Sequence, residues 1–533
     1  MAFRFLALIL LFTALFGALG FRLYQLQIQH GAEYVSRVHA RSELAEGTAL
    51  RRGQILFTNR SGVDIPVAQN RDFPYIYAVP SEITDPEGTA RVLAPLIGQN
   101  EAALTTAISN PDNKFRRLVD QASADVVQAV NAAKLQGIYT DAVKQYRAYP
   151  FQRLGAHILG FVGFTEKQTE PIGLYGTERF RDETLAAGND VRLLIDRDLQ
   201  EQAEQSLGKL VDQYSATLGT IIIQDSRTGA ILALASKPDF DPNTYGESPV
   251  KNFQDPAIQY QYEPGSVMKP FTMLAGIDSG VLASTTTFLD TGSVTMNGKT
   301  ITNYDGKAYG RITMTNVLEH SVNTGAVFAE KKVGHDRFYN YLLKLGFGEK
   351  TGIDLPDEIV GSLRNLQRKN AQAIDFANAS FGQGTAVTPV QLVTAFSALA
   401  NGGLLMRPYM TAEEKPYVVR RVASEAAAHE VALMLESAVK VNSVAVIPGY
   451  RVAGKTGTAN IPENGVYTED LNHTFVGFAP VSNPRFTILV RLERPQSVGA
   501  LAGMTVVPAF RDLMQYTLTT LHVPPDSVGE VSL

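Results

Sequence analysis

The sequence contains no cysteine. This absence excludes disulfide bonds, thiolate nucleophiles and cysteine-ligated metals. The eight histidines show no H-E-x-x-H or comparable spacing, so we expect no metal site and no cofactor. No strong basic run occurs, and the net charge of −5 gives no reason to expect a nucleic-acid partner.

The sequence also lacks internal repeats and low-complexity tracts. Its 533 residues are too many for one compact core, so we expect two or three domains. A hydrophobic content of 45 % and a charged content of 19 % are ordinary for a folded protein.

One long uncharged run stands near the N-terminus, from Phe5 to Phe21. Its 17 residues would form a helix of roughly 26 Å, the short end of a membrane span. We interpret it as an uncleaved transmembrane anchor. A cleaved signal peptide, with Ala18-Leu19-Gly20 near the cleavage site, and a buried soluble helix are the alternatives.

The first part of the chain carries no recognisable catalytic pattern. A polar helix or stalk is expected over residues 23–50, followed by a β-rich stretch that starts at Arg51. The Ala, Leu and Val spacing over residues 81–145 predicts amphipathic helices.

The second part begins near residue 200 and mixes strands with helices. Asp198 is expected to cap a helix through Gln213, and residues 219–236 read as a hairpin. Helical patterns dominate residues 265–440. Three strands and a final helix are expected at 450–458, 474–480, 485–492 and 508–521. Strands at both ends with helices between them indicate one layered sheet.

Ser266-Val267-Met268-Lys269 is the first of three short motifs in the second part. Ser266 and Lys269 would share one face at the start of a helix. A serine hydroxyl is a weak nucleophile and needs a base beside it. A lysine can be that base if burial or neighbouring charges lower its pKa.

The other two motifs are Ser321-Val322-Asn323 and Lys455-Thr456-Gly457-Thr458. A hydroxyl and an amide two residues apart in a loop can relay a proton and hold a substrate amide. Because side chains alternate along a strand, Thr456 and Thr458 should share one face and Lys455 the other. Gly454 and Gly457 are expected to leave room for a substrate backbone.

Each motif alone is more often a solvated helix face or a plain turn. Their joint occurrence in this order is typical of penicillin-binding proteins and serine β-lactamases.

The sequence resembles a class B penicillin-binding protein, closest to the cell-division (septal) type, over nearly its whole length. Beyond the three motifs, the resemblance depends on several short segments: 52–55, 59–62, 147–150, 173–178, 237–243, 381–384 and 388–389. Thr58 and His320 depart from the family pattern, and neither is a catalytic side chain.

The resemblance implies an α/β (α+β) transpeptidase domain of the penicillin-binding and serine β-lactamase type, an antiparallel sheet covered by helices. An elongated α+β pedestal and an N-terminal transmembrane helix would precede it. The implied division is 1–22 for tail and anchor, 23–198 for the pedestal, 199–525 for the transpeptidase domain and 526–533 for a C-terminal tail. The catalytic domain would lie outside the cytoplasmic (inner) membrane, in the periplasm.

The resemblance also implies a D,D-transpeptidase that cross-links peptidoglycan. Ser266 would attack the D-Ala–D-Ala bond of a donor stem peptide, and Lys269 would act as general base. Ser321 would carry the proton to the leaving group, and Asn323 would position the peptide. Lys455 and Thr456 would bind the terminal carboxylate on the Gly457 strand. The N–H groups of Ser266 and Thr458 would form the oxyanion hole.

The implied partners are donor and acceptor stem peptides, β-lactams, a membrane-embedded glycan polymerase and other division or elongation proteins. Residues 450–459, 465–467 and 475–480 resemble the division type, and the elongation type is the alternative. A β-lactamase or β-lactam sensor, a catalytically silent scaffold and a carboxypeptidase are further alternatives. The long first part argues against the β-lactamase, and the intact motifs argue against the scaffold.

Overall fold

The computed structural model describes residues 52–59, 61–164, 171–496, 499 and 501–526. The predicted anchor at Phe5–Phe21 and the stalk at 23–50 lie outside these residues. Within the described part of the chain, no helix has the length and apolar character needed to cross a membrane. The chain forms two compact units. Of the described residues, unit 1 holds Arg52 and Asn70–Ala148, and unit 2 holds those between Gly53 and Gln69 and those from Tyr149 onward.

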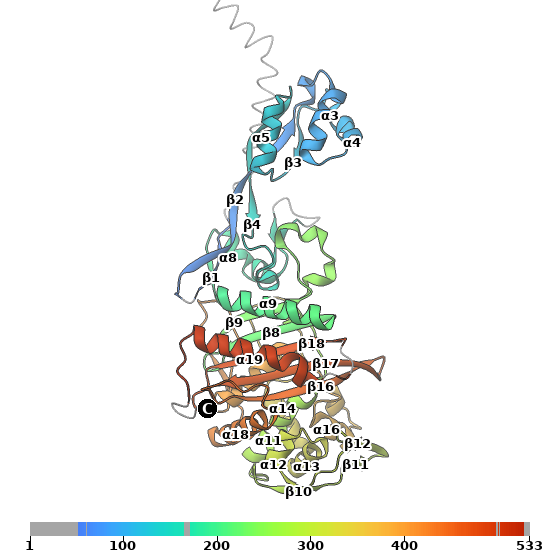
Figure 1. Cartoon of the computed structure of the whole chain (residues 1–533), viewed down its shortest axis with the longest axis vertical. Coiled ribbons are helices and arrows are strands. Elements are labelled where there is room, and N and C mark those ends of the chain that lie inside the picture. The colour runs from blue at the N-terminus through green and yellow to red at the C-terminus, as the bar shows by residue number, and fades with distance from the viewer. Residues whose placement is uncertain (1–51, 60, 165–170, 497–498, 500, 527–533) are drawn as a thin grey trace, which may run out of the picture. The chain divides into compact units, whose positions relative to one another are not determined.

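Unit 1 is a small α+β body. Its helices are α3 (Pro86–Ile97), α4 (Glu101–Ile108) and α5 (Ala124–Ala133), which gather around β3 (Arg116–Val119) and the adjoining half of β2 (Asp64–Ala78) (Figure 1). A 3₁₀ turn, η2 (Pro80–Glu82), follows β2, and β4 (Ile138–Ala148) pairs with β2. Local capping explains the helix starts, because Asp85, Asn100 and Ser123 each accept a hydrogen bond from a first-turn N–H.

The helical prediction for residues 81–145 is only partly right. The three helices are present, but β3 and most of β4 interrupt the predicted stretch. Ile76, Leu93, Leu104 and Ile138 pack in one core, so the strands here depend on burial against helices rather than on a local pattern.

The first part of unit 2 contains short elements around a small sheet. β1 (Ile55–Thr58) pairs antiparallel with the start of β2 and parallel with β7 (Val191–Asp196). The other elements are α6 (Ala156–Leu159), β5 (Val162–Gly163), β6 (Ile172–Gly173), α7 (Gly176–Phe180) and α8 (Asp182–Ala186).

The main sheet of unit 2 has five strands in the order β16-β17-β18-β8-β9, and every neighbouring pair is antiparallel. Its strands come from both ends of the unit, as the sequence predicts. They are β8 (Leu218–Asp225), β9 (Ile231–Lys237), β16 (Ala453–Glu463), β17 (Val466–Ala479) and β18 (Phe486–Glu493).

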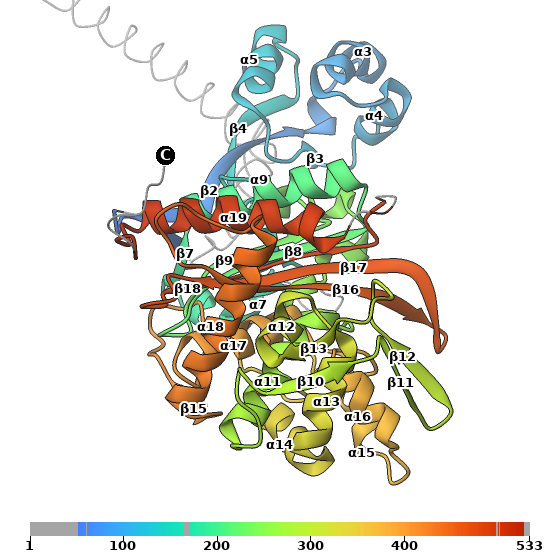
Figure 2. The same cartoon turned by 60° about the horizontal axis from the view of Figure 1, so that its bottom comes forward.

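Helices cover both faces of this sheet. α9 (Arg197–Tyr214) and α19 (Ala502–Thr520) lie on one face (Figure 2). On the other face lie α11 (Lys269–Asp278), α17 (Pro389–Ala400) and α18 (Glu425–Asn442). The strands are buried on both sides because their side chains alternate between two cores. Ile222 and Leu489 belong to one core, whereas Ile221 and Ile488 belong to the other.

Two predicted helix starts are wrong. α9 begins at Arg197 and its cap is Asp196, whose carboxylate accepts from the N–H groups of Asp198 and Leu199. α19 begins at Ala502, six residues before the predicted start, because Pro508 is tolerated inside the helix.

The part of unit 2 between β9 and β16 is mainly helical, as predicted, with six short strands added. Its helices are α10 (Pro256–Gln259), α11 (Lys269–Asp278), α12 (Met314–Glu319), α13 (Asn323–Val333), α14 (His335–Lys344), α15 (Arg364–Gln367), α16 (Ala373–Ala379), α17 (Pro389–Ala400) and α18 (Glu425–Asn442). The 3₁₀ turns are η3 (Pro242–Glu247), η4 (Val250–Phe253) and η5 (Gly265–Met268). The short strands are β10 (Thr287–Asp290), β11 (Ser293–Met296), β12 (Lys299–Thr302), β13 (Gly310–Thr313), β14 (Leu404–Met406) and β15 (Val418–Arg421).

Candidate active site

The three sequence motifs meet in one cleft of unit 2, with a volume of about 530 Å³. η5 supplies Ser266, the turn between α12 and α13 supplies Ser321, and β16 supplies Lys455. All three residues line the cleft. The structure therefore brings together the three segments that the sequence motifs mark.

The serine of the first motif stands on a tight turn that precedes α11. η5 is a 3₁₀ helix rather than the α-helical turn expected, and α11 starts at Lys269. Residues i and i+3 eclipse in a 3₁₀ helix, which brings Lys269 directly over Ser266. The Lys269 Nζ lies 2.9 Å from the Ser266 Oγ.

The 381–384 loop contacts the turn that carries Ser266. The N–H of Gly265 donates to the carbonyl of Gly382, and a Cβ on Gly382 would lie 2.1 Å from the Gly265 carbonyl oxygen. Gly382 also has a φ of +85°, so its backbone needs glycine for two independent reasons.

The second motif is a strained turn rather than a loop. Ser321 has a φ of +55°, and Asn323 is the first residue of α13. The turn directs both oxygens of Ser321 at one amine, because Lys269 Nζ lies 2.5 Å from the Ser321 carbonyl oxygen and 3.1 Å from its Oγ. Asn323 lines the cleft, and its amide donates to the carbonyl of Thr302 at 2.9 Å.

The third motif lies on β16 with the predicted alternation. Lys455 is buried, whereas Thr456 and Thr458 are half-buried on the opposite face. The Lys455 Nζ lies 3.0 Å from the Ser321 Oγ and 3.4 Å from the Thr456 Oγ1. Ser321 Oγ is thus shared by two amines.

The two strand glycines have a different role from the one predicted. A Cβ on Gly457 would lie 2.6 Å from the Pro264 carbonyl, and one on Gly454 would lie 2.4 Å from the Phe475 ring. Gly457 thus lets β16 pack directly on the nucleophile turn, and Gly454 gives room to the Phe475 ring on β17.

Burial sets the electrostatics of the cleft. Lys269 is completely buried, which lowers its pKa well below the usual lysine range, and the nearby Lys455 charge lowers it further. Burial lowers the pKa of Lys455 to about 7. A lowered pKa favours the neutral form of Lys269, which is the form that a general base needs.

Some residues of the cleft carried no signal in the sequence. One flank holds Asn303, Tyr304, Asp305 and His320, which precede or separate the recognised motifs. Outside the residues that line the cleft, Glu263 next to the serine turn accepts a hydrogen bond from the Tyr467 hydroxyl on β17 at 2.8 Å. No local pattern predicts this contact, because the partners are 204 positions apart.

Among the described residues, no group of three His, Asp or Glu side chains could hold a metal ion. The arrangement that is present, a serine hydroxyl beside a neutral buried amine, suits acyl transfer through a serine ester.

Family comparisons cover both parts of the chain. The penicillin binding protein transpeptidase domain matches residues 219–515, and the penicillin-binding protein dimerisation domain matches residues 49–208. Stage V sporulation protein D of Bacillus subtilis is 29 % identical, covering 97 % of this chain and 86 % of the relative. Peptidoglycan D,D-transpeptidase FtsI of Escherichia coli is 28 % identical, covering 92 % and 87 %.

Solved structures agree with this assignment. Penicillin binding protein 3 of Mycobacterium tuberculosis in its apo form aligns with a TM-score of 0.66 at 28 % identity, over 72 % of this chain and 92 % of that one. The same protein complexed with aztreonam aligns with a TM-score of 0.70 at 24 % identity, over 89 % and 97 %. With the predicted transpeptidase fold and both family domains present, the chain belongs to the class B penicillin-binding proteins, which join a dimerisation domain to a transpeptidase domain.

Proposed function

We propose that this protein is a peptidoglycan D,D-transpeptidase that works through an acyl-enzyme on Ser266. One observation carries the proposal: the buried Lys269 Nζ lies between Ser266 Oγ, at 2.9 Å, and Ser321 Oγ, at 3.1 Å. The first contact suits removal of the serine proton, and the second suits its delivery to a leaving group.

In the proposed acylation, Ser266 Oγ attacks the carbonyl carbon of the penultimate D-Ala while its proton passes to Lys269. The tetrahedral oxyanion is held by the N–H groups of Ser266 and Thr458. When the C–N bond breaks, Ser321 Oγ passes a proton to the amine of the leaving D-Ala. The ester on Ser266 is then attacked by the amine of a second stem peptide.

The donor is held by the other residues of the cleft. Lys455 and Thr456 bind its terminal carboxylate, on the strand that includes Gly457, and Asn323 positions the peptide amide. Support comes from the position of these side chains in one cleft. β-Lactams would acylate Ser266 by the same steps, in keeping with the aztreonam complex of the mycobacterial relative.

We also propose a biological setting. The chain would be anchored in the cytoplasmic membrane by one N-terminal helix, with the pedestal at 23–198 and the transpeptidase domain at 199–525 outside the cytoplasm. The family matches at 49–208 and 219–515 support this division. Septal synthesis with a separate glycan polymerase is favoured by the name of the FtsI relative, and elongation is the alternative.

The test is labelling with a fluorescent penicillin, followed by peptide mapping. A stable adduct on Ser266 that is lost in Ser266→Ala is the expected result. An adduct on another serine would contradict the assignment of the nucleophile. Rapid release of hydrolysed drug would indicate a β-lactamase, and no adduct in the wild type would indicate a silent scaffold.

A further inference from the structure

Glu263 joins three separate segments at the edge of the cleft. It stands three residues before Ser266, and its Oε1 accepts a hydrogen bond from the N–H of Gly384 at 3.0 Å. Its Oε2 accepts one from the Tyr467 hydroxyl at 2.8 Å. One carboxylate thus connects the nucleophile turn, the 381–384 loop and the β16–β17 hairpin.

The nucleophile turn and β16 are also in direct contact near Gly265. A change in the Glu263 contact can therefore shift the one against the other. A Cβ on Gly265 would lie 3.0 Å from the Ala459 Cβ and 3.3 Å from the Thr458 carbonyl oxygen. The position of Ser266 relative to Thr458 therefore depends on how β16 packs against the turn. Glu263 is the side chain that ties the two together.

The carboxylate of Glu263 has hydrogen bonds but no cation. No ion pair among residues of the described chain includes it, and burial raises its pKa. A half-buried carboxylate that has no hydrogen-bond donor costs free energy, and this one accepts from a tyrosine O–H and a backbone N–H. Its two donors are therefore held firmly in place.

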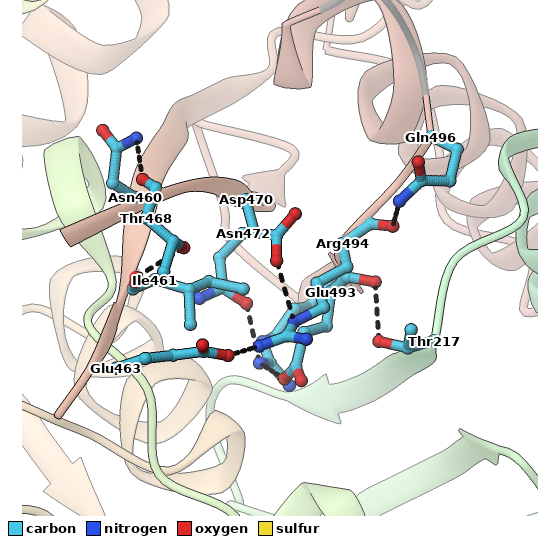
Figure 3. A network of polar contacts seen from close by, with 11 residues as sticks. Thr217, Asn460, Ile461, Glu463, Thr468, Asp470, Asn472, Glu493, Arg494 and Gln496 are labelled. Carbon is cyan, nitrogen blue, oxygen red and sulfur yellow. Dashed lines mark hydrogen bonds and ion pairs between the residues drawn. The ribbon is translucent and has the colours of Figure 1, made fainter.

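Other contacts, which do not include Glu263, hold the β16–β17 hairpin near its tip. Arg494, which follows β18, forms ion pairs with Glu463 and Asp470 near the hairpin tip (Figure 3). Asn460 and Thr468 close the hairpin between them, because the Asn460 amide donates to the Thr468 carbonyl at 2.8 Å (Figure 3). Tyr467 lies on the strand that pairs with β16, opposite Pro462, so its contact with Glu263 connects β16 to the nucleophile turn.

We propose that Glu263 is a positioning residue, whose contact with Tyr467 fixes the nucleophile turn against β16 and so sets the rate at which Ser266 is acylated. The inference rests on the proposed acylation of Ser266. It assigns Glu263 no proton transfer, because the amine at Ser266 Oγ is that of Lys269.

The experiment compares stopped-flow acylation of the full-length protein by a chromogenic penicillin, resolving the dissociation constant from the rate of the chemical step. Tyr467→Phe removes only the hydroxyl, and we expect the chemical step to slow roughly tenfold while the dissociation constant changes less than about twofold. Glu263→Ala should slow it at least as much. The double variant should be no slower than Glu263→Ala alone, because both changes remove one contact.

Three controls separate positioning from general loosening. Tyr417→Phe removes a hydroxyl from an exposed tyrosine far along the chain and should leave the rate unchanged. Arg494→Ala releases the other side of the hairpin and should slow acylation less than about twofold. Glu263→Gln keeps an acceptor for Gly384 and a donor for Tyr467, so it should recover most of the rate and keep the wild-type pH profile.

Several results would overturn the inference: an unchanged chemical step in Tyr467→Phe, additive losses in the double variant, or equal losses in Arg494→Ala. A pH profile that loses a limb in Glu263→Gln would make Glu263 a proton carrier instead. Absence of any wild-type adduct on Ser266 would overturn the proposed function, and this inference with it.

Discussion

Two buried amines around one hydroxyl give the cleft its electrostatic asymmetry. Lys269 and Lys455 both lie within hydrogen-bond distance of Ser321 Oγ, at 3.1 and 3.0 Å. Two ammonium groups so close in a buried site would repel each other, so at most one carries a proton. Burial lowers the pKa of Lys269, and the Lys455 charge lowers it further, which favours a free amine beside Ser266.

This asymmetry predicts a large effect of Lys269→Ala. We expect acylation of Ser266 by penicillin to fall by about 10²–10⁴-fold, since no other amine lies at Ser266 Oγ. Stopped-flow acylation measures the effect, and Lys209→Ala on exposed α9 serves as the matched control. A near-normal rate in Lys269→Ala would show that another group takes the proton.

Lys455 gives a prediction about pH. A carboxylate ligand binds the protonated amine, and the pKa of Lys455 in the free protein is about 7. The noncovalent affinity for a carboxylate ligand should therefore stay constant below pH 7 and fall by about tenfold per pH unit above it. Above pH 7, binding should be accompanied by proton uptake. Calorimetry of a penicillin with Ser266→Ala, in buffers of different ionisation enthalpy, measures that uptake. Binding without proton uptake at pH 8 would place the carboxylate elsewhere.

At the scale of the elements, close backbone contacts hold the cleft together. Glycines stand where η5, the 381–384 loop and β16 approach one another, and Gly382 is the tightest of these glycine positions. The catalytic geometry therefore depends on residues with no chemistry of their own.

Gly382→Ala tests this dependence. A Cβ there would meet the Gly265 carbonyl, so we expect the nucleophile turn to shift and acylation to fall at least tenfold, with a loss of stability of about 2 kcal/mol or more. Gly348→Ala is the matched control, because its φ of +86° equals the +85° of Gly382 but the nearest atom to its Cβ would be 3.6 Å away. Equal acylation rates in the two variants would show that backbone strain, and not the close approach, matters.

The elements that the sequence predicted well are those with a local cause. The hairpin over residues 219–236 has a turn signal between two apolar runs, and it forms β8 and β9. The start of α9 was misplaced by two residues because Asp196 and Asp198 both suit a cap, and only the backbone at Asp196 is extended. β3 and β4 were missed because the helical spacing at residues 87–97 and 123–135 was extended over the whole of 81–145.

At the scale of the whole molecule, the three motifs read from the sequence lie in one cleft, and their catalytic roles stay a prediction. The contacts between residues far apart in the sequence were not predicted. Neither the contact of Lys455 with Ser321, 134 positions apart, nor that of Glu263 with Tyr467 follows from spacing along the chain. Such contacts follow from strand register and helix packing, which one sequence without relatives does not specify.

A buried carboxylate on α9 makes the stability of unit 2 depend on pH. Glu204 accepts hydrogen bonds from the Gly155 N–H at 2.7 Å and the Gln200 amide at 2.8 Å, and Gln200 in turn bonds to β9 through Leu234. Burial raises the pKa of Glu204 to about 7, against the two hydrogen bonds that lower it. Nearby Asp239 raises it slightly and Lys237 lowers it.

The sign follows from proton binding. The folded protein holds a proton on Glu204 up to about pH 7, whereas the unfolded chain releases it near pH 4.5, so this stability is complete at low pH and is lost as pH rises to 7. The loss amounts to about 3 kcal/mol. Glu204→Gln mimics the protonated form and should remove this dependence, so that the variant exceeds the wild type in melting temperature at pH 8 but not at pH 5. Glu201→Gln, which alters an exposed carboxylate on the same helix, should leave the difference between the two pH values unchanged; an identical response of both variants would show that Glu204 is ionised throughout.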